Sequence, residues 1–366
     1  MAGTIGRCCV FNTDEEANIN QAVARIRLKE RSDPTFLAKY LNSYWGQLGF
    51  LKQRHDVSQP NINLAELRQI PIILPLLQQQ KNILETIAPM EREARFFDEN
   101  AAKVRQAVAD ILPDELGITA ATDDIRYFFR SGEEKQSIAF AVPASAVDDR
   151  LQYLFFHPRQ RALADLQNRF SCTTLAKAVA VPIRRGEQPE YEDDGEIMVL
   201  KTVDLKNGFI ASDHALRVGR DFFESKPQAH IQRGDVLLAS TGYGSMGKVD
   251  IYESYEEAMC DGHISILRPI ANYDPYFLAY YLRSYLGQLQ IEKWFSGSSG
   301  QIEIQAGDIG RIILPTPDEN GVPLTEQKRI AALITTRLEE ARSLEAQAAQ
   351  KWLEAHEIFE KMLFAS

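Results

Sequence analysis

The sequence predicts an α+β protein in which mostly β domains alternate with two long helices that pair as an antiparallel coiled coil. Three observations support this fold class. One stretch occurs twice, at Asp33–Leu48 and at Asp274–Leu289. Glycine turns and β-prone residues precede each copy. Apolar residues at heptad spacing follow each copy, which is typical of a long helix in a coiled coil.

The two copies match in one register. Phe36 corresponds to Phe277, and the Gly-Gln-Leu triplet that begins at Gly46 corresponds to the triplet that begins at Gly287. Their separation, roughly 240 residues, is far beyond the ~20 to 50 residues of solenoid repeats, so the sequence indicates a duplicated domain. The second copy has a long front portion, residues 150–241, that the first copy lacks.

Composition indicates an ordinary globular protein. The chain has 366 residues, of which 45% are apolar and 25% charged. It contains neither an apolar run of the ~18 residues that a membrane span needs nor a signal sequence, so we expect a cytoplasmic protein. Its four cysteines, Cys8, Cys9, Cys172 and Cys260, lack zinc-site spacing and are expected to be buried thiols without metal.

The net charge of −10 speaks against indiscriminate nucleic-acid binding. It remains compatible with a local basic groove, because acidic residues can be concentrated on other surfaces.

In chain order, Gly3–Leu28 reads as strands and turns that need a partner sheet. A helix begins after Asp33, with Asp33 as the N-cap and Pro34 in the first turn, and carries an apolar face as far as Leu48. A second short strand is expected at Gln69–Leu74.

The first heptad pattern runs from about Gln78 to Leu112. Pro89 lies inside it and is expected either to kink the helix or to mark its true start. The connector that follows includes a candidate strand at Ile138–Val142. In the second domain, a helix is expected at Arg159–Arg169, and strands are expected at Ile197–Val203, Asp235–Ser240 and His263–Leu267.

The resulting division has five parts. The expected boundaries are 1–77 for a partial first domain, 78–112 for a central helix, 113–150 for a connector, 151–324 for a complete second domain and 325–366 for a C-terminal helix.

The segment from Gly242 to Lys248 resembles a phosphate-binding P-loop, but Val249 replaces the Ser or Thr that would hold Mg²⁺ and the following residues read as a strand. Nucleotide hydrolysis is therefore not expected. The first copy keeps a glycine before a cation at Arg7. Two interpretations remain: a turn that presents Lys248 or Arg7 to a DNA phosphate or base edge, or a plain hairpin turn.

Other motifs give no catalytic site. Asp274 and Pro275 superficially match an amino-methyltransferase loop, but the duplicate at Asp33 precedes the same helical pattern, so helix capping explains both. No nuclease cluster, HExxH pair or convincing Ser-His-Asp set is visible. Ser296–Gln301 reads as a polar loop and Arg184-Arg185 as the densest positive charge of the front portion. Each fits either a contact with DNA or a solvated loop.

In the order and duplication of these segments, the chain resembles the DNA-specificity subunit of type I restriction-modification systems. The matching pieces include Gly234–Ser240 leading to Gly247-Lys248, then Asp274–Leu278, Ile312–Pro315 and Glu326–Ile330. That family is built from two target-recognition domains, each followed by a long helix, and the two helices pair antiparallel as a spacer.

The resemblance implies a non-catalytic recognition subunit. Its partners would be double-stranded DNA, methyltransferase subunits and, in some complexes, a restriction subunit; S-adenosylmethionine would be bound only by the methyltransferase. The expected DNA-binding residues are Arg7, Arg184, Arg185, Lys201, Thr202, Ser240, Thr241, Tyr243, Lys248, Ser296, Ser298, Ser299 and Gln301. The expected partner-binding residues of the helices are Met90, Phe97, Val104, Leu338, Leu344, Trp352 and Phe359.

The first domain departs from the family pattern, because it lacks the portion equivalent to residues 175–243. Three explanations remain open: an upstream polypeptide supplies the missing half, two copies of the chain assemble, or the gene is a decayed remnant. A coiled-coil scaffold without a DNA role is the alternative function. The sequence does not determine the DNA target, the spacer length or the oligomeric state.

Overall fold

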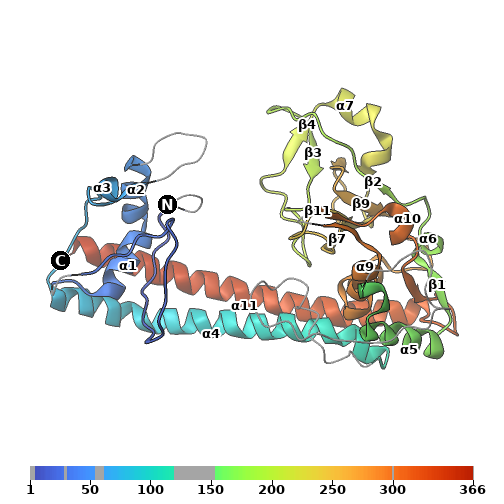
Figure 1. Cartoon of the computed structure of the whole chain (residues 1–366), viewed down its shortest axis with the longest axis horizontal. Coiled ribbons are helices and arrows are strands. Elements are labelled where there is room, and N and C mark those ends of the chain that lie inside the picture. Colours follow the sequence, from blue (N-terminus) through green and yellow to red (C-terminus); the bar gives the residue numbers. More distant parts are fainter. Residues whose placement is uncertain (1–4, 29–30, 54–61, 119–152, 299–300, 366) are drawn as a thin grey trace. The chain divides into compact units, whose positions relative to one another are not determined.

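The computed structural model describes residues 5–28, 31–53, 62–118, 153–298 and 301–365. The chain divides into two compact units, each described by itself: unit 1 comprises residues 1–102 and 341–366, and unit 2 comprises residues 103–340. Both long helices, α4 (Leu77–Glu115) and α11 (Leu324–Phe364), contribute residues to both units (Figure 1).

Unit 2 is an α+β unit, as the sequence predicts. Besides its parts of α4 and α11 it contains the helices α5 (Arg161–Arg169), α6 (Leu175–Ala178), α7 (Arg220–Ser225), α8 (Pro275–Arg283), α9 (Tyr285–Trp294) and α10 (Ala306–Ile309), with 3-10 turns at Tyr153–Phe156, Pro158–Gln160 and Pro227–Ala229. Its strands are β1 (Cys172–Thr174), β2 (Arg184–Arg185), β3 (Ile197–Leu200), β4 (Leu216–Val218), β5 (His230–Ile231), β6 (Val236–Ala239), β7 (Val249–Ile251), β8 (Ala258–Cys260), β9 (Ile264–Leu267), β10 (Ser296–Ser298), β11 (Gln301–Glu303) and β12 (Ile313–Pro315).

The strands form two four-stranded sheets, in the orders β2-β9-β6-β7 and β4-β3-β8-β5, and the two pairs β1-β12 and β10-β11. The β3–β8 pair is parallel and the others are antiparallel. The predictions of helix Arg159–Arg169 and of strands around β3, β6 and β9 are confirmed. Ser296–Gln301 was predicted as a loop, but its described residues Ser296–Ser298 and Gln301 lie on the paired strands β10 and β11.

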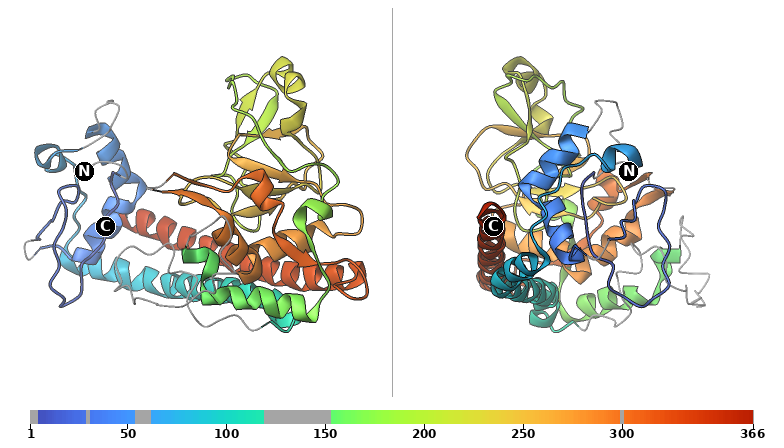
Figure 2. Two further views of the ribbon diagram at one scale, coloured as in Figure 1. Left: turned by 45° about the vertical axis from the view of Figure 1, so that its right-hand side comes forward. Right: turned by 90° about the vertical axis from the view of Figure 1, so that its left-hand side faces the viewer.

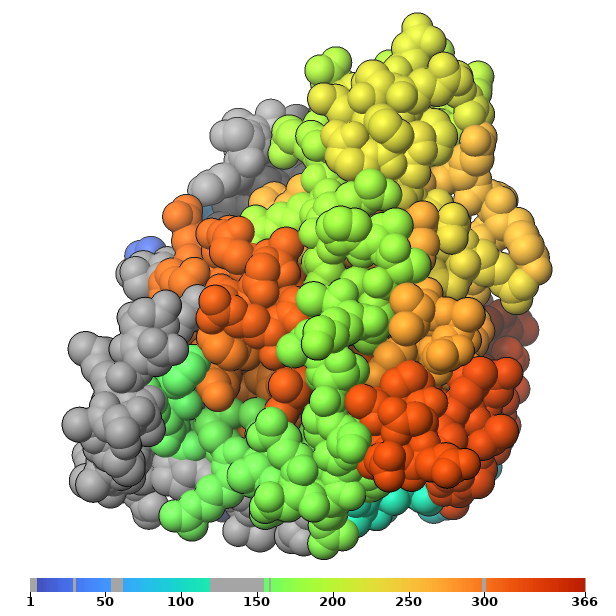
Figure 3. Space-filling view, turned by 90° about the vertical axis from the view of Figure 1, so that its right-hand side faces the viewer, coloured from blue at the N-terminus to red at the C-terminus, as the bar shows by residue number. Residues whose placement is uncertain are grey.

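Unit 2 has a front half, residues 172–239, and a back half, residues 247–315, and its sheets need both. Within the sheets, β7 pairs with β6, β8 with β3 and β5, and β9 with β2 and β6. β12 likewise pairs with β1. Each of these back-half strands therefore takes its ladder partners from the front half, which in Figure 3 lies in green and yellow across the orange residues of the back half.

Unit 1 contains α1 (Pro34–Asn42), α2 (Tyr44–Gln53), α3 (Leu64–Leu67) and parts of the long helices. The predicted cap is confirmed, since the Asp33 carboxylate accepts from the N–H groups of Thr35 at 2.8 Å and Phe36 at 3.1 Å. The helix expected to continue to Leu48 is interrupted at Ser43. Ser43 is extended and its hydroxyl donates to Tyr40 O at 2.7 Å, which ends α1.

The strands predicted at Gly3–Leu28 and Gln69–Leu74 are absent from the described residues of unit 1. The internal repeat gives the physical reason. These segments correspond to β7, β8, β9 and β12, whose ladder partners in unit 2 all belong to the front half, and no described residue of unit 1 corresponds to that half. A strand sequence without a partner strand cannot satisfy its main-chain hydrogen bonds as a ladder.

The long helices pack together in antiparallel sense within each unit (Figure 2). In unit 1, Lys351 pairs with Glu93 at 3.2 Å; in unit 2, Arg329 pairs with Glu115. α4 begins at Leu77 and passes through Pro89, so the prediction that the true start lies at Pro89 is wrong. The candidate strand Ile138–Val142 lies outside the described residues.

The duplication extends to individual hydrogen bonds. The carboxamide of Gln80 accepts from Asp33 N at 2.9 Å and donates to Pro75 O at 2.8 Å. Gln327 makes the same two bonds, with Asp274 N at 2.9 Å and Val322 O at 2.8 Å. Each Gln therefore joins the start of its long helix to the cap of its repeated helix.

The four cysteines are free thiols, but they are not uniformly buried. Cys260 is buried, Cys8 and Cys172 are half-buried, and Cys9 is exposed, so the expectation of four buried thiols is wrong for Cys9. No helix in the described part of the chain combines the length and the hydropathy required to cross a membrane.

Candidate nucleic-acid interface

The turn between β6 and β7 is built on two glycines in left-handed backbone conformation. Gly242 has φ +88° and Gly247 has φ +85°, values that favour glycine. The N–H of Met246 donates to Gly242 O at 2.9 Å, and that of Gly247 to Ala239 O at 2.9 Å. This geometry holds Tyr243 at an exposed position and Lys248 at the end of the turn.

The side chain of Gln288 holds this turn in place by two hydrogen bonds. Its amide donates to Gly247 O at 2.9 Å and to Leu282 O at 2.8 Å, so it ties the turn to the end of α8. Gln47 makes the same bonds in unit 1, to Gly6 O at 2.9 Å and Leu41 O at 2.7 Å, and there the exposed Arg7 follows Gly6. The repeat of this glycine and this glutamine is visible in the sequence, but the hydrogen bond between them was not predicted.

The β10–β11 hairpin is bonded to the same turn. Gly242 N donates to Ile302 O at 2.9 Å, Ile304 N donates to Ser240 O at 2.9 Å, and Thr241 forms a bridge with Glu303. Predicted residues far apart in sequence are thus brought together, with Ser296 on β10 and Gln301 exposed on β11. Ser298 is described only as part of β10, and Ser299 lies outside the described residues.

Arg184 and Arg185 lie on β2 and not in a solvated turn. The Arg185 guanidinium contacts a Glu303 carboxylate oxygen at 3.1 Å and donates to Ile304 O at 2.9 Å. Arg185 is half-buried. Because it lies on β2 and bonds to Glu303 of β11 and to Ile304, it joins the β10–β11 hairpin to the sheet that contains β2. Gly186 continues the segment past Cys260 O, where a Cβ would approach to 2.0 Å. These contacts indicate a positioning role for Arg185.

A polar cluster around His263 lies beside the turn. Thr241 Oγ1 is 2.7 Å from His263 Nδ1, and the buried Ser240 hydroxyl donates to His263 O at 3.2 Å. The Asp261 carboxylate accepts from His263 N at 3.0 Å. Burial raises the pKa of Asp261, while this N–H, the His263 ring and Lys201 act in the opposite direction. His263 was not among the predicted residues.

Lys201 and Thr202 follow β3 and are half-buried. Lys201 Nζ is 5.7 Å from the centre of the Tyr191 ring, and its main-chain N–H donates to Asp204 at 2.8 Å. Asp261 N donates to the carbonyl of the preceding Leu200 at 3.0 Å, so Lys201 lies at the side of the His263 cluster.

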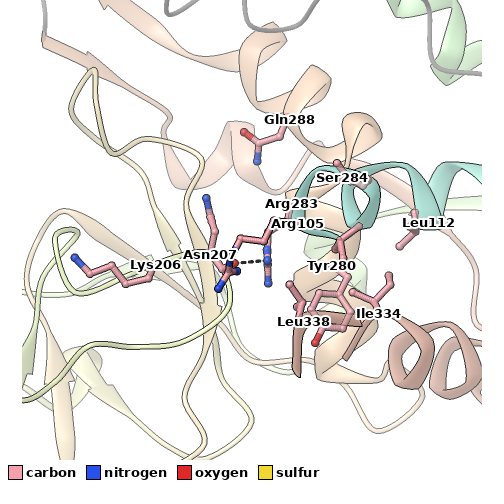
Figure 4. Close-up of a pocket in the computed structure, with 12 residues that line it drawn as sticks. Arg105, Leu112, Lys206, Asn207, Tyr280, Arg283, Ser284, Gln288, Ile334 and Leu338 are labelled. Atoms are coloured by element: carbon pink, nitrogen blue, oxygen red, sulfur yellow. Dashed lines mark hydrogen bonds between the residues drawn. The ribbon is translucent and has the colours of Figure 1, made fainter. Parts of the chain in front are cut away.

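A basic pocket of about 420 Å³ in unit 2 shares Gln288 with the turn (Figure 4). Arg105 of α4, Lys206 and Arg283 of α8 line it together with Asn207 and Gln288. Lys206 and Asn207 lie on a loop that is held in place by hydrogen bonds. Their N–H groups donate to the buried Asp250 carboxylate at 2.7 and 2.9 Å, and Arg283 donates to Asn207 O. No sequence pattern indicates this pocket, because its walls come from segments far apart in the chain.

The predicted partner-binding residues of the helices divide by burial. Leu338 and Phe359 are buried in the cores of their units. Met90, Phe97, Val104 and Leu344 are half-buried. Trp352 is exposed and its indole N–H donates to Asp98 at 2.9 Å. Two exposed apolar side chains, Phe96 and Leu353, were missed because they fall outside the heptad seam.

Within the described residues, no group of three His, Cys, Asp or Glu side chains could hold a metal ion. The site consists of turns and a hairpin carried on sheets, with hydroxyl, amide and cationic side chains. Such a site can donate hydrogen bonds and positive charge to an extended anionic ligand.

The fold defines the class of protein: a duplicated unit, each copy of which ends in one of two paired long helices. The family model for the type I restriction modification DNA specificity domain matches residues 2–96 and 181–351, well over half of the chain. The chain belongs to this family and is a non-catalytic DNA-specificity subunit of a type I restriction-modification system.

Three solved structures are similar to the chain. An HsdS subunit from Thermoanaerobacter tengcongensis has 18% identity and a TM-score of 0.41, with 91% of this chain and 71% of that chain covered. An S subunit from M. genitalium has 12% identity, a TM-score of 0.43 and coverages of 91% and 73%. A structure concerned with complex assembly and conformational transition of the type I R-M system has 18% identity, a TM-score of 0.43 and coverages of 91% and 72%. No match was found among curated proteins.

Proposed function

We propose that unit 2 carries the complete target-recognition domain, residues 151–324, and contacts double-stranded DNA with the surface formed by the turn Thr241–Lys248 and the β10–β11 hairpin. The observation that carries this proposal is the set of main-chain bonds that joins the turn to the hairpin, 2.9 Å from Gly242 N to Ile302 O and 2.9 Å from Ile304 N to Ser240 O. These bonds turn two separate polar segments into one rigid edge.

The residues of this edge have different roles. Tyr243 and Gln301 are exposed and are assigned to base edges or sugars; Lys248 is assigned to a phosphate. Ser240 and Arg185 position the edge, because their polar groups are already bonded within the protein. A charge of −10 for the whole chain does not prevent this, since contacts within about a Debye length decide phosphate binding.

The test uses a randomised duplex library selected on the full chain. We expect the wild type to enrich a sequence motif. The K248E variant should lose affinity for that motif and show a binding slope against salt that is smaller by about one phosphate contact. K177E, at an exposed lysine on α6, is the matched control. Equal affinity and salt slope for K248E and wild type would remove Lys248 from the interface.

We further propose that the α4–α11 pair docks methyltransferase subunits, which bind S-adenosylmethionine, and in some complexes a restriction subunit. The side chains of Phe96 and Leu353 support this proposal, because they are large apolar side chains that α4 and α11 leave exposed. In this assembly the helices 78–112 and 325–366 act as spacers. Action on DNA and four free thiols both agree with the cytoplasm.

Capture of a co-expressed methyltransferase subunit tests the docking. F96D and L353D should reduce capture, while S343D, at an exposed polar position of α11, should not. Undiminished capture by F96D with L353D would place the docking surface elsewhere. Sequencing of methylated DNA from the same cells then reads the target directly, and a split motif is the expected result.

A further inference from the structure

Unit 1 repeats the back half of unit 2. Gly6 corresponds to Gly247 and Gln47 to Gln288, so each position between them corresponds to the position 241 residues later. By this correspondence the segment 8–26 repeats the residues of β7, β8 and β9. The residues Ile72–Pro75 repeat Ile312–Pro315, which contain β12.

The apolar side chains of these segments differ in burial between the two units. In unit 2 six of these side chains are 2% exposed or less: Tyr252, Cys260, Ile264, Leu267, Ile312 and Leu314. Their counterparts in unit 1 are between 43% and 65% exposed: Phe11, Ile19, Val23, Ile26, Ile72 and Leu74. Positions that keep apolar residues are thus covered in one copy and uncovered in the other.

Unit 2 shows what covers them. The strand β6 lies between β7 and β9, and β1 lies along β12. Beyond the ladder, Leu175 N donates to Ile312 O at 2.7 Å and Thr316 N to Ser171 O at 2.8 Å. The occupant is the front half, which brings an apolar central strand, Val236–Ala239, and the buried side chains of Leu175 and Ala178.

We propose that unit 1 is a docking surface for a polypeptide segment that its own described residues do not supply, with the chemistry of the front half of unit 2: a short strand followed by a helical turn, and an apolar central strand that pairs on both edges. The surface consists of Phe11, Ile19, Val23, Ile26, Ile72 and Leu74. Such a partner adds strands to segments that carry strand sequences but no ladder, which is a recognised mode of peptide binding. A second copy of this chain does not fit as the partner, because its own front half is already paired within its unit 2.

This inference rests on the duplication and not on the proposed DNA contacts. No readout below involves DNA, so failure of either proposal leaves the other standing.

The experiment co-expresses the full chain with a tagged fragment of its own residues 153–245, which stands in for the partner and can fold on the chain. We expect the fragment to co-purify with the chain. Amide hydrogen exchange at Val23–Ile26 and Ile72–Leu74 should slow by about 100-fold, as for amides that enter a stable ladder. Exchange in β7 and β9 should not change, which excludes replacement of the chain's own front half.

The variant V23D/I26D tests the surface directly. Both residues are exposed, so the substitutions should leave the fold of unit 1 intact while abolishing capture of the fragment. S343D, at an exposed position of α11 in unit 1, is the control and should capture the fragment normally. Capture by V23D/I26D equal to that of wild type would overturn the proposal.

Two further outcomes would also contradict it. Slow exchange at Val23–Ile26 in the chain alone would mean that its own residues already cover the surface. If the separate fragment does not accumulate in cells, the test uses a copy of residues 153–245 joined ahead of Gly6 by a glycine-serine linker. Fast exchange at Val23–Ile26 in that linked chain would show that the surface does not accept a front half.

Discussion

Gly287 shows how a single residue fixes the repeated helix pair. A Cβ at this position would lie 2.4 Å from Leu282 Cα and 2.4 Å from Tyr281 O, and neither main-chain atom can move without shifting α8. Gly46 has the same environment in unit 1, 2.3 Å from Tyr40 O. The close turn between the two short helices therefore depends on glycine in both copies.

We expect G287A to lower the free energy of unfolding by about 3 kcal/mol, because the added methyl group forces main chain apart. Urea unfolding followed by circular dichroism measures this change. G244A is the control: a Cβ there meets nothing within 4 Å, so its effect should stay within about 0.5 kcal/mol. Similar losses in both variants would rule out the steric explanation.

Glu292 makes the stability of unit 2 depend on pH. Burial raises the pKa of its carboxyl from 4.5 to about 7, and the Arg159 guanidinium, 3.6 Å away, opposes the shift. The folded state therefore keeps a proton that the unfolded chain loses above pH ~4.5. By linkage, this contribution to the free energy of unfolding is complete below about pH 4.5 and is lost as the pH rises through about 7.

The loss corresponds to at most about 3.5 kcal/mol, since each pKa unit is worth about 1.4 kcal/mol. E292Q has no titrating group at this position. The free energy of unfolding of wild type minus that of E292Q should therefore fall between pH 5 and pH 8. E339Q, at an exposed glutamate, should preserve the pH dependence of wild type. A constant difference between wild type and E292Q would show that Glu292 is ionised throughout this range.

Phe359 joins two elements that are far apart in the sequence. It is 2% exposed, and its ring centre lies 5.5 Å from that of Phe36 on α1. F359A should destabilise unit 1 by about 3 to 5 kcal/mol, the usual cost of truncating a buried phenylalanine. Hydrogen exchange at Ile83 and Ile87, in the same core, provides the measurement.

L353A is the comparison for F359A, because Leu353 lies on the same helix but is exposed. It should leave exchange at Ile83 and Ile87 unchanged. Equal acceleration in the two variants would mean that α11 contributes to unit 1 through its helicity and not through the Phe359 contact.

The elements that the sequence predicted correctly are those fixed by local chemistry. The Asp33 cap, the heptads of α4 and α11 and the strands around β3, β6 and β9 depend on residue types at short spacing. The strands at Gly3–Leu28 were wrong because a strand also needs a neighbour, and that neighbour is a property of the whole fold. The break at Ser43 was missed because the apolar periodicity continues across it.

The same distinction applies to the site. The sequence identified the glycine turn before Lys248, since its conformation is local. It could not predict that Arg185 bonds to Glu303 and Ile304, because the partners are more than a hundred residues apart. Nor could it identify the pocket at Arg105 and Arg283, whose walls meet only after folding.

At the scale of the whole molecule, two compact units share two helices. The core of unit 2 takes Ile330, Ile334 and Leu338 from the first part of α11, whereas the core of unit 1 takes Ala355 and Phe359 from its last part. Unit 1 is therefore assembled from the two ends of the described chain, and its contacts span almost the full sequence.

This arrangement sets an order of events during synthesis. Phe359 leaves the ribosome roughly 270 residues after Ile87, a delay of about 15 to 55 s at ordinary rates of translation. Throughout that interval α1 and the first half of α4 have no α11 to pack against, and their apolar faces stay open to other chains. The nascent chain therefore needs protection at α1 and α4 until α11 has been made.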